Sequence, residues 1–288
     1  MKISDLLKSK KITVSCELFP PKQGGALDNA KNIVHEMAAL RPDFMSVTYG
    51  AGGTNAANTL ELANAVQNVN GVTALAHLTC IASERPKIRE VLTDLKEHGI
   101  ENILALRGDL PQDSSLALST QFHHASDLMK EIRDFGGFCI GGACYPEGHP
   151  ESPSLDFDID QLKRKVENGC DFLTTQMFFD NDILYHFMYR LLRAGIKVPV
   201  IAGIMPVTNA KQMKRILSLS GTALPRRFRM IVDRFADQPE AMKQAGIAYA
   251  TEQMIDLFAS GVNHVHIYTM NRPDIAGSIM QNLSSMIR

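Results

Sequence analysis

The chain of 288 residues is 45% hydrophobic and carries 30 basic and 31 acidic residues, which leaves a formal net charge of -1. This balance gives no electrostatic reason to expect binding to nucleic acid or to an anionic membrane surface. The opening MKISDLLKSKK lacks the apolar core and cleavage site of a signal peptide, and no apolar run approaches the roughly 20 residues of a membrane span.

Short apolar or β-branched runs alternate with longer amphipathic segments along the chain. The runs predict eight strands, at 11–19, 44–50, 72–80, 102–109, 137–146, 171–179, 198–206 and 264–271. Helical periodicity lies between them, for example at 26–40, 82–99, 159–169 and 209–221. Several helical segments end in the glycine that is typical of a helix C-terminus, namely Gly99, Gly136, Gly169, Gly195 and Gly261.

Eight strand-then-helix units predict an α/β fold, a (β/α)8 TIM barrel, which typically takes roughly 250 residues. Residues 1–288 are expected to form a single catalytic barrel domain. The structural rival is a doubly wound open sheet, which would require a G-x-G-x-x-G fingerprint that neither ELFPPKQGG nor GAGGTN supplies. The longest non-periodic stretch, 106–121, is expected to form a loop over the barrel mouth.

The cysteines are odd in number and scattered, with no C-x-x-C pair: Cys16, Cys80, Cys139, Cys144 and Cys170. Three of them lie within or at the ends of apolar runs, where a free cysteine behaves as a small hydrophobe. This pattern predicts reduced, structural thiols in a cytoplasmic protein. No His, Asp or Glu cluster has metal-site spacing, so no metal is expected.

In a barrel of this class the active site lies at the C-terminal ends of the strands. Strand seven ends in the apolar GIMP, but the other seven predicted strands deliver polar side chains to that end. These are Glu17, Thr48, Tyr49, His77, Thr79, Arg107, Asp109, Tyr145, Glu147, His149, Gln176, Tyr268, Asn271 and Arg272. A purely structural barrel would not require them, so the pattern predicts a functional site.

The principal candidates each have a structural alternative. Glu17, followed closely by two prolines, is either a rim carboxylate paired with a basic residue or an acid whose pKa is raised by a partly apolar pocket. Asp109 either pairs with Arg107 or hydrogen-bonds a heterocyclic ligand, which would leave Arg107 free for phosphate or ring carbonyls. His77 is either a satisfied core histidine or a residue of the site.

The remaining candidates are more easily explained by structure alone. His264 and His266 alternate within the last strand, which favours packing or interstrand hydrogen bonds, and His123 and His124 are expected to be exposed in the long loop. The basic run LKRK (162–165) is typical of a solvated helix face, although it could also hold a diphosphate.

Eight stretches between about residues 12 and 272 occur in a distinctive order: CELFPPK, SVTYGAGG, AHLTC, ALRGDLP, CYPEGHPE, LKRKVENGCDFLTTQMFFD, AGIMPVTN and HIYTMNRP. Together they resemble the 5,10-methylenetetrahydrofolate reductases, flavoprotein oxidoreductases of one-carbon metabolism and methionine biosynthesis. The resemblance implies a (β/α)8 barrel with non-covalent FAD. It also implies reduction of 5,10-methylenetetrahydrofolate to 5-methyltetrahydrofolate, with hydride passing from NADH or NADPH through FAD in a ping-pong cycle.

The resemblance also implies residue roles. Glu17 would be the general acid that assists ring opening at folate N10, which generates the N5 iminium that accepts hydride, and Asp109 would tune the flavin and bind folate. The implied folate contacts are Gln176, Gln212, Tyr268 and Arg272, of which Gln176 would also meet the nicotinamide. The implied flavin contacts are Thr48, Tyr49, Ala51, His77, Arg107, Gly108, Asp109, His124, Tyr145, His149, Asp158, Arg164 and Lys165.

Three positions depart from the enterobacterial members of that family. Ile216 stands where they carry a stacking aromatic, His124 replaces a tyrosine, and Ser152 replaces an alanine. These changes leave the chemistry intact and bear on the electron donor and on how the flavin is held. The chain stops after the barrel, so the C-terminal regulatory domain of eukaryotic members is not expected.

The resemblance favours a homo-oligomer, and two rival functions remain open. One is a flavin- and folate-binding subunit that receives electrons from a partner iron–sulfur protein. The cluster would have to belong to the partner, because the five dispersed cysteines of this chain cannot hold one. The other is a non-flavin barrel lyase or methyltransferase that uses Glu17 and Asp109 as an acid–base pair.

Overall fold

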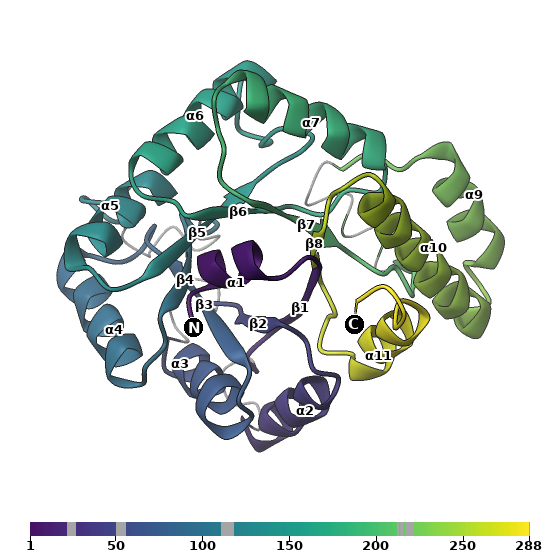
Figure 1. The fold of residues 1–288 in the computed structure, drawn as a ribbon, viewed down its shortest axis with the longest axis horizontal. Coiled ribbons are helices and arrows are strands. Elements are labelled where there is room, and N and C mark those ends of the chain that lie inside the picture. The colour runs from purple at the N-terminus through teal and green to yellow at the C-terminus, as the bar shows by residue number, and fades with distance from the viewer. Residues whose placement is uncertain are drawn as a thin grey trace.

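The computed structural model describes residues 1–21, 27–49, 56–110, 118–211, 213, 216 and 222–287. Parallel strands form a closed barrel in which each strand pairs with the next and β8 pairs with β1 (Figure 1). They are β1 (Thr13–Leu18), β2 (Phe44–Val47), β3 (Thr73–Thr79), β4 (Asn102–Leu106), β5 (Cys139–Cys144), β6 (Phe172–Thr175), β7 (Val200–Ile204) and β8 (His264–Ile267). The predicted single-domain (β/α)8 barrel is confirmed, and the open-sheet alternative is wrong.

Helices alternate with the strands and surround the barrel (Figure 1). They are α2 (Leu27–Ala39), α3 (Ala56–Asn64) with the π-helical turn η2 (Ala65–Val69), α4 (Arg85–Glu97), α5 (Ala125–Phe135), α6 (Leu155–Glu167), α7 (Asn181–Arg193), α9 (Arg226–Phe235), α10 (Pro239–Ala259) and α11 (Pro273–Asn282). The five predicted terminal glycines all have positive φ, between +68° and +102°, and so support the helix ends read from the sequence. The helix predicted at 209–221 lies largely outside the described residues.

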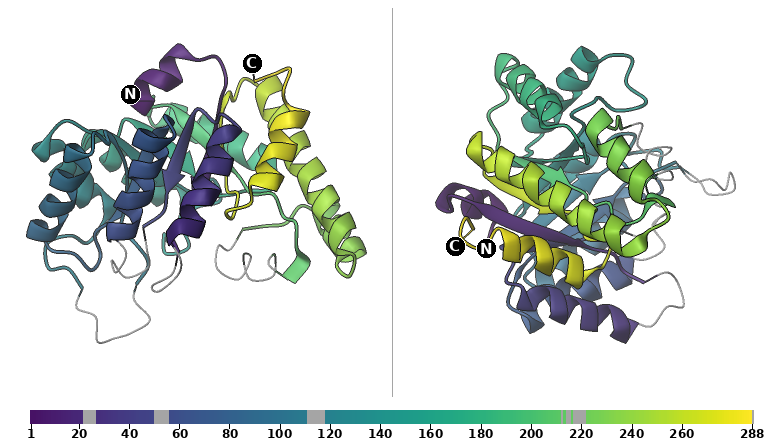
Figure 2. Two further views of the ribbon diagram at one scale, coloured as in Figure 1. Left: turned by 90° about the horizontal axis from the view of Figure 1, so that it is seen from below. Right: turned by 90° about the vertical axis from the view of Figure 1, so that its right-hand side faces the viewer.

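A short N-terminal helix, α1 (Ile3–Ser9), lies across one end of the barrel (Figure 1), and both chain termini lie at that end (Figure 2). Its apolar side chains Ile3, Leu6 and Leu7 pack against residues inside the barrel, among them Phe44 and Phe172. Because Phe44 and Phe172 begin their strands, α1 covers the N-terminal end of the barrel and leaves the opposite, C-terminal end for function.

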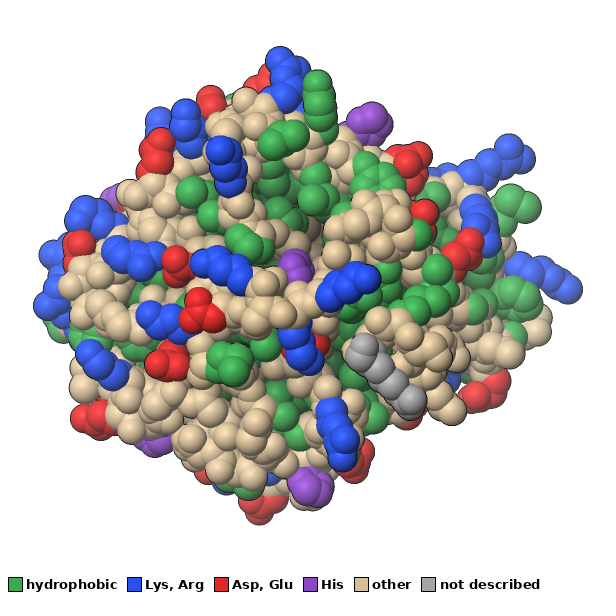
Figure 3. Space-filling model, viewed as in Figure 1, with side chains coloured by type: hydrophobic (Ala, Val, Ile, Leu, Met, Phe, Trp, Pro, Cys, Tyr) green, Lys and Arg blue, Asp and Glu red, His purple; other side chains and the backbone are tan. Residues whose placement is uncertain are grey.

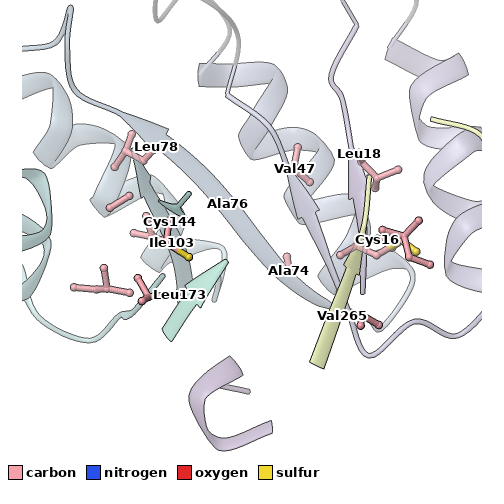
Figure 4. Packing of buried hydrophobic residues seen from close by; sticks show 14 of the residues in the cluster. Cys16, Leu18, Val47, Ala74, Ala76, Leu78, Ile103, Cys144, Leu173 and Val265 are labelled. Atoms are coloured by element: carbon pink, nitrogen blue, oxygen red, sulfur yellow. The ribbon is translucent and has the colours of Figure 1, made fainter. Parts of the chain in front are cut away.

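Alternation along each strand separates the barrel interior from the outer core. On β1, the side chains of Val14, Cys16 and Leu18 belong to the large apolar cluster under the helices, where Figure 4 shows Cys16 and Leu18 with residues of other strands. The alternate residues of β1 therefore face the interior, since successive strand side chains point to opposite faces. This places Glu17 inside the barrel, at the last inward position of its strand.

Two helices that lie wholly within the described residues, α9 and α10, stand between β7 and β8, where a minimal repeat would have one (Figure 1). The inner face of α9 contributes Phe228 and Val232 to a separate apolar cluster that also holds Phe179, Val207 and Met242. Phe228 stacks on Phe179 at 5.3 Å and on Tyr249 at 4.1 Å between ring centroids. This cluster extends the core sideways at the β6–β7 side of the barrel.

The face that carries α1 shows acidic and basic side chains interspersed, as the nearly balanced charge suggests (Figure 3). None of the helices described has both the length and the apolar content that a bilayer crossing requires. All five cysteines are buried and free, which confirms the expectation of structural thiols.

Candidate active site

Glu17 is fixed at the end of β1 by the segment that follows β8. Thr269 donates its hydroxyl to the Glu17 carbonyl oxygen at 2.8 Å, and the Asn271 amide exchanges two hydrogen bonds with the Phe19 backbone, at 2.8 and 2.9 Å. Asn271 and Met270 adopt positive φ values of 56° and 52°, which turns the chain back toward β1. The position of the carboxyl group therefore depends on a clamp from the far end of the sequence as well as on the prolines.

The Glu17 carboxyl group is held in its neutral form by burial. Its residue is 7% exposed, and burial raises its pKa to about 8. Within the described part of the chain, no side chain or backbone group forms a hydrogen bond or ion pair with this carboxyl group. The alternative that Glu17 forms an ion pair with a basic residue at the rim is therefore wrong for the described part of the chain. Near pH 7 Glu17 carries a proton that it can deliver to a ligand.

Polar residues of β8 are in register with the residues of β1 that precede Glu17. The His266 ring contacts the Ser15 hydroxyl at 2.7 Å and the Ser46 hydroxyl at 3.1 Å, and burial lowers its pKa to about 3. His264 contacts the Thr13 hydroxyl at 3.0 Å. The prediction that these histidines serve interstrand hydrogen bonding is confirmed, and His266 is neutral at ordinary pH.

Tyr268, a predicted folate contact, is oriented by two constraints. Its hydroxyl donates to the Thr175 carbonyl oxygen at 2.6 Å, and its ring lies where a Cβ on Gly203 would come within 2.6 Å of it. Burial first, and then the charge of Glu17, raise the pKa of the phenol. Tyr268 is thus a neutral neighbour of Glu17 whose own proton is already donated to the barrel wall.

A cavity of about 560 Å³ opens beside this interior, in the size range of small-ligand sites. It is lined from the ends of β2 to β5 and from α6, and it contains every described residue among the predicted flavin contacts: Thr48, Tyr49, His77, Arg107, Gly108, Asp109, His124, Tyr145, His149, Asp158, Arg164 and Lys165. The Thr48 N–H donates to the Leu18 carbonyl oxygen at 2.9 Å, so the cavity wall adjoins the strand that carries Glu17.

His77 contributes an unsatisfied polar atom to the cavity wall. Its Nε2 is buried and has no hydrogen-bond partner among the residues that the structure describes, and burial lowers its pKa to about 3. An unpartnered buried nitrogen is costly, so a ligand that hydrogen-bonds it would be stabilised there. The alternative that His77 is a core histidine with all its hydrogen bonds satisfied is therefore wrong for the described part of the chain.

The cationic side of the cavity is formed by Lys165 and Arg107. Lys165 donates to the Ala143 carbonyl oxygen at 2.7 Å, and burial lowers the pKa of its ammonium group. Arg107 forms a two-pronged pair with Glu151, at 2.5 and 2.8 Å. The local pair of Arg107 with Asp109, one of the two alternatives for Asp109, is therefore not the one that forms, because the β5–α6 loop brings Glu151 to the guanidinium group.

Asp158 and Asp127 shape the loops around the cavity. Asp158 accepts hydrogen bonds from the His149 N–H at 3.3 Å and from the Ser152 hydroxyl at 3.1 Å, which ties the β5–α6 loop to α6. Asp127 accepts the backbone N–H groups of His123 and His124, both at 2.9 Å, at the start of α5. The side chains of His123 and His124 are exposed, as predicted.

Several predicted residues lie outside this cavity. Glu17 and Tyr268 belong to the barrel interior, Gln176 is half-buried at the end of β6 with its N–H on the Cys144 carbonyl oxygen at 2.7 Å, and Arg272 is exposed and paired with Asp274 at 2.9 Å. Ala51 and Gln212 lie outside the described residues. Within those residues, no group of three or more His, Cys, Asp or Glu side chains could hold a metal ion.

The cavity also contains residues that were not predicted, among them Glu151, Phe157, Gln161 and Ser126. Phe157, Gln161 and Arg164 follow the i, i+4, i+7 spacing of one helix face. Counting three and seven residues toward the N-terminus from Arg164, in the basic run at 162–165, would have identified Gln161 and Phe157 from the sequence.

A family model described as methylenetetrahydrofolate reductase matches residues 2–284. The 5,10-methylenetetrahydrofolate reductase of Escherichia coli K12 is 35% identical over 272 residues, which cover 94% of this chain and 90% of that protein. A probable methylenetetrahydrofolate reductase (NADH) of Oryza sativa is 36% identical over 297 residues, covering 98% of this chain and 50% of that protein. The chain thus spans about half the length of the plant relatives that it matches.

Solved structures with lower sequence identity share the fold. A Clostridium thermocellum protein that binds two copies of 5-methyl-5,6,7,8-tetrahydrofolic acid superposes with a TM-score of 0.67 at 14% identity, over 99% of both chains. An oxaloacetate acetylhydrolase superposes with a TM-score of 0.54 at 10% identity, over 99% of this chain and 84% of that one. At such identities the likeness supports the barrel architecture alone.

Proposed function

The chain belongs to the methylenetetrahydrofolate reductase family, and we propose that it reduces 5,10-methylenetetrahydrofolate to 5-methyltetrahydrofolate at the C-terminal end of the barrel. The observation that carries this proposal is the buried Glu17 carboxyl group, whose pKa of about 8 keeps a proton available near neutral pH. The family match and the adjoining cavity support it. The C. thermocellum protein with the same barrel architecture binds 5-methyl-5,6,7,8-tetrahydrofolic acid, which is consistent with a folate substrate for this chain.

The cavity residues fit non-covalent FAD. His77 offers an unpartnered ring nitrogen, and Arg164 and Lys165 offer cationic groups suited to a diphosphate. Gly108, with φ of +89°, lets the backbone turn at the cavity wall, where a Cβ would lie 3.1 Å from Thr79. When bound, FAD supplies two-electron chemistry, in which hydride from NADH or NADPH is stored and passed to the folate in two half-reactions.

The chain's own contribution to the reaction is a positioned proton. Glu17 would protonate N10 of the folate, which breaks the bond from N10 to the bridging carbon and leaves an electrophilic iminium at N5. Hydride transfer to that carbon forms the methyl group. Because burial, and not an ion pair, keeps Glu17 protonated, its acidity is matched to this task near neutral pH.

The other predicted roles are proposed on the same basis. Asp109 is exposed on the cavity wall, where it can hydrogen-bond a flavin pyrimidine or a pterin ring. We propose Gln176, Tyr268 and Arg272 as folate contacts, together with Gln212, and Ala51 as a flavin contact. Of these residues, Gln176 and Tyr268 are half-buried and Arg272 is exposed, whereas Gln212 and Ala51 lie outside the described residues.

We further propose that residues 1–288 act as one catalytic unit in the reducing cytoplasm, which the five buried free thiols support. The expected homo-oligomer stays a prediction, and sedimentation velocity of the purified chain tests it.

Purification of the chain with analysis of its flavin tests the proposed function. The expected result is a yellow protein that releases FAD on denaturation and oxidises NADH or NADPH with menadione or methylenetetrahydrofolate as acceptor. A colourless protein that takes up no added flavin would contradict the proposal and favour a lyase or methyltransferase. Bound FAD without NAD(P)H oxidation would instead indicate a separate electron-donor protein.

A further inference from the structure

We propose that Phe157 is the platform on which the adenine ring of FAD stacks, and this inference rests on the proposed function. Phe157 lines the cavity in the first turn of α6, and its residue is 46% exposed. Single exposed apolar residues are common on protein surfaces. This one stands in the wall of a ligand-sized cavity, where its ring offers a flat apolar surface to whatever binds there.

The backbone around Phe157 is firmly held although its ring is open to solvent. Its N–H donates to the Ser154 side-chain oxygen at 3.2 Å, which caps the start of α6. The next residue, Asp158, is buried and ties the helix to the β5–α6 loop through His149 and Ser152. The ring is therefore presented from a rigid turn, which limits the entropy lost when a flat ligand packs on it.

The spacing along α6 matches an extended ligand with an anionic centre and a planar end. Gln161 and Arg164 lie on the same helix face as Phe157, and Arg164 is about 10 Å further along the axis. Lys165, next to Arg164, also lines the cavity. If Arg164 and Lys165 bind the diphosphate, the attached nucleoside can extend toward the N-terminus of α6. There Phe157 can stack on its base.

NADH and NADPH also carry an adenine, so two dinucleotides share this chemistry. The same cavity that contains Phe157 continues to His77, Arg107 and Asp109 at the strand ends. A dinucleotide that stays bound and fills this cavity from Phe157 to the strand ends would place its redox ring at the barrel mouth. This continuity favours the adenine of FAD over that of the exchanging nicotinamide cofactor.

Calorimetric titration of the full chain, freed of flavin, with FAD and separately with FMN tests the proposal, because FMN lacks the adenine. Phe157→Ala is expected to raise the Kd for FAD about tenfold, equivalent to about 1.4 kcal/mol, and to leave the Kd for FMN within about twofold. Phe157→Trp should restore FAD affinity. Tyr189→Ala is the matched control, since Tyr189 is 61% exposed on α7 and does not line the cavity.

An unchanged Kd for FAD in Phe157→Ala, or equal weakening of FAD and FMN, would overturn the stacking proposal while leaving the flavin enzyme intact. A raised KM for NADH with unchanged FAD affinity would also overturn it and assign the ring to the nicotinamide cofactor. Failure of the unmodified chain to bind either flavin would overturn the proposed function together with this inference.

Discussion

Replacing Glu17 with glutamine should make the folded protein more stable at neutral pH, by an amount that depends on pH. In the unfolded chain the carboxyl group ionises with a pKa near 4.5, whereas burial raises the folded pKa to about 8. Below pH 4.5 the group is protonated in both states and contributes no difference. As the pH rises toward 8, only the unfolded state gains from ionisation, so the wild type loses stability that the uncharged variant keeps.

The size of this effect follows from the shift. Each pH unit between the two pKa values is worth about 1.4 kcal/mol, so the variant should gain about 3 kcal/mol over the wild type between pH 4.5 and pH 7. The gain should level off above pH 8. His77 and His266, whose pKa values burial lowers to about 3, destabilise the fold in the opposite sense as the pH falls below about 6.5. Both proteins contain them, so their effect cancels in the difference.

The assay is urea unfolding of both proteins, followed by circular dichroism at several pH values from 4.5 to 9. Glu97→Gln, an exposed substitution on α4, serves as the control and should show a difference from wild type that does not vary with pH. A flat difference for Glu17→Gln as well would refute the reasoning. It would mean that the folded protein does not hold this carboxyl group in its neutral form.

Three further predictions concern the barrel interior and the cavity. Gly203→Ala should destabilise the fold by about 1–3 kcal/mol or more, because the new methyl group meets the Thr175 carbonyl oxygen and then the Tyr268 ring, and thermal unfolding measures the loss. Lys165→Met should weaken FAD binding about tenfold or more and lower the salt dependence of that binding. Lys163→Met, which changes an exposed neighbour, should leave both quantities unchanged, and fluorescence titration with FAD at two salt concentrations measures them. Glu151→Gln should change the free energy of unfolding by less than about 1 kcal/mol, because Glu151 is 54% exposed, and a larger loss in urea titration would contradict this.

The fold was predictable because its signals are local. The strand runs alternate or remain apolar over a few residues, and glycines such as Gly99 and Gly169 end helices by positive φ, which the sequence reveals directly. The burial of α1 against the barrel was not predictable. A seven-residue helix has little stability of its own, and its position depends on the apolar floor that residues such as Phe44 and Phe172 form only after the barrel has closed.

The site was predictable where strand ends deliver polar residues and less so where distant loops meet. Glu17 could be placed from the strand pattern, but the clamp from Asn271, 252 positions along the chain from Phe19, has no local signal. The pairing of Arg107 with Glu151 depends on how the β5–α6 loop folds back, which the spacing of residues does not reveal. The raised pKa of Glu17 likewise follows from burial, which only the closed barrel produces.

Separate measurement of the two half-reactions of Glu17→Gln by stopped-flow absorbance tests the role of Glu17 most directly. The variant should be reduced by NADH or NADPH at a rate within about twofold of the wild type. Reoxidation of its flavin by methylenetetrahydrofolate should be slower by about 10²–10⁴-fold, because the proton for N10 is missing. Unchanged reoxidation by the folate, or an equal loss in both half-reactions, would contradict the assignment of Glu17 as the acid.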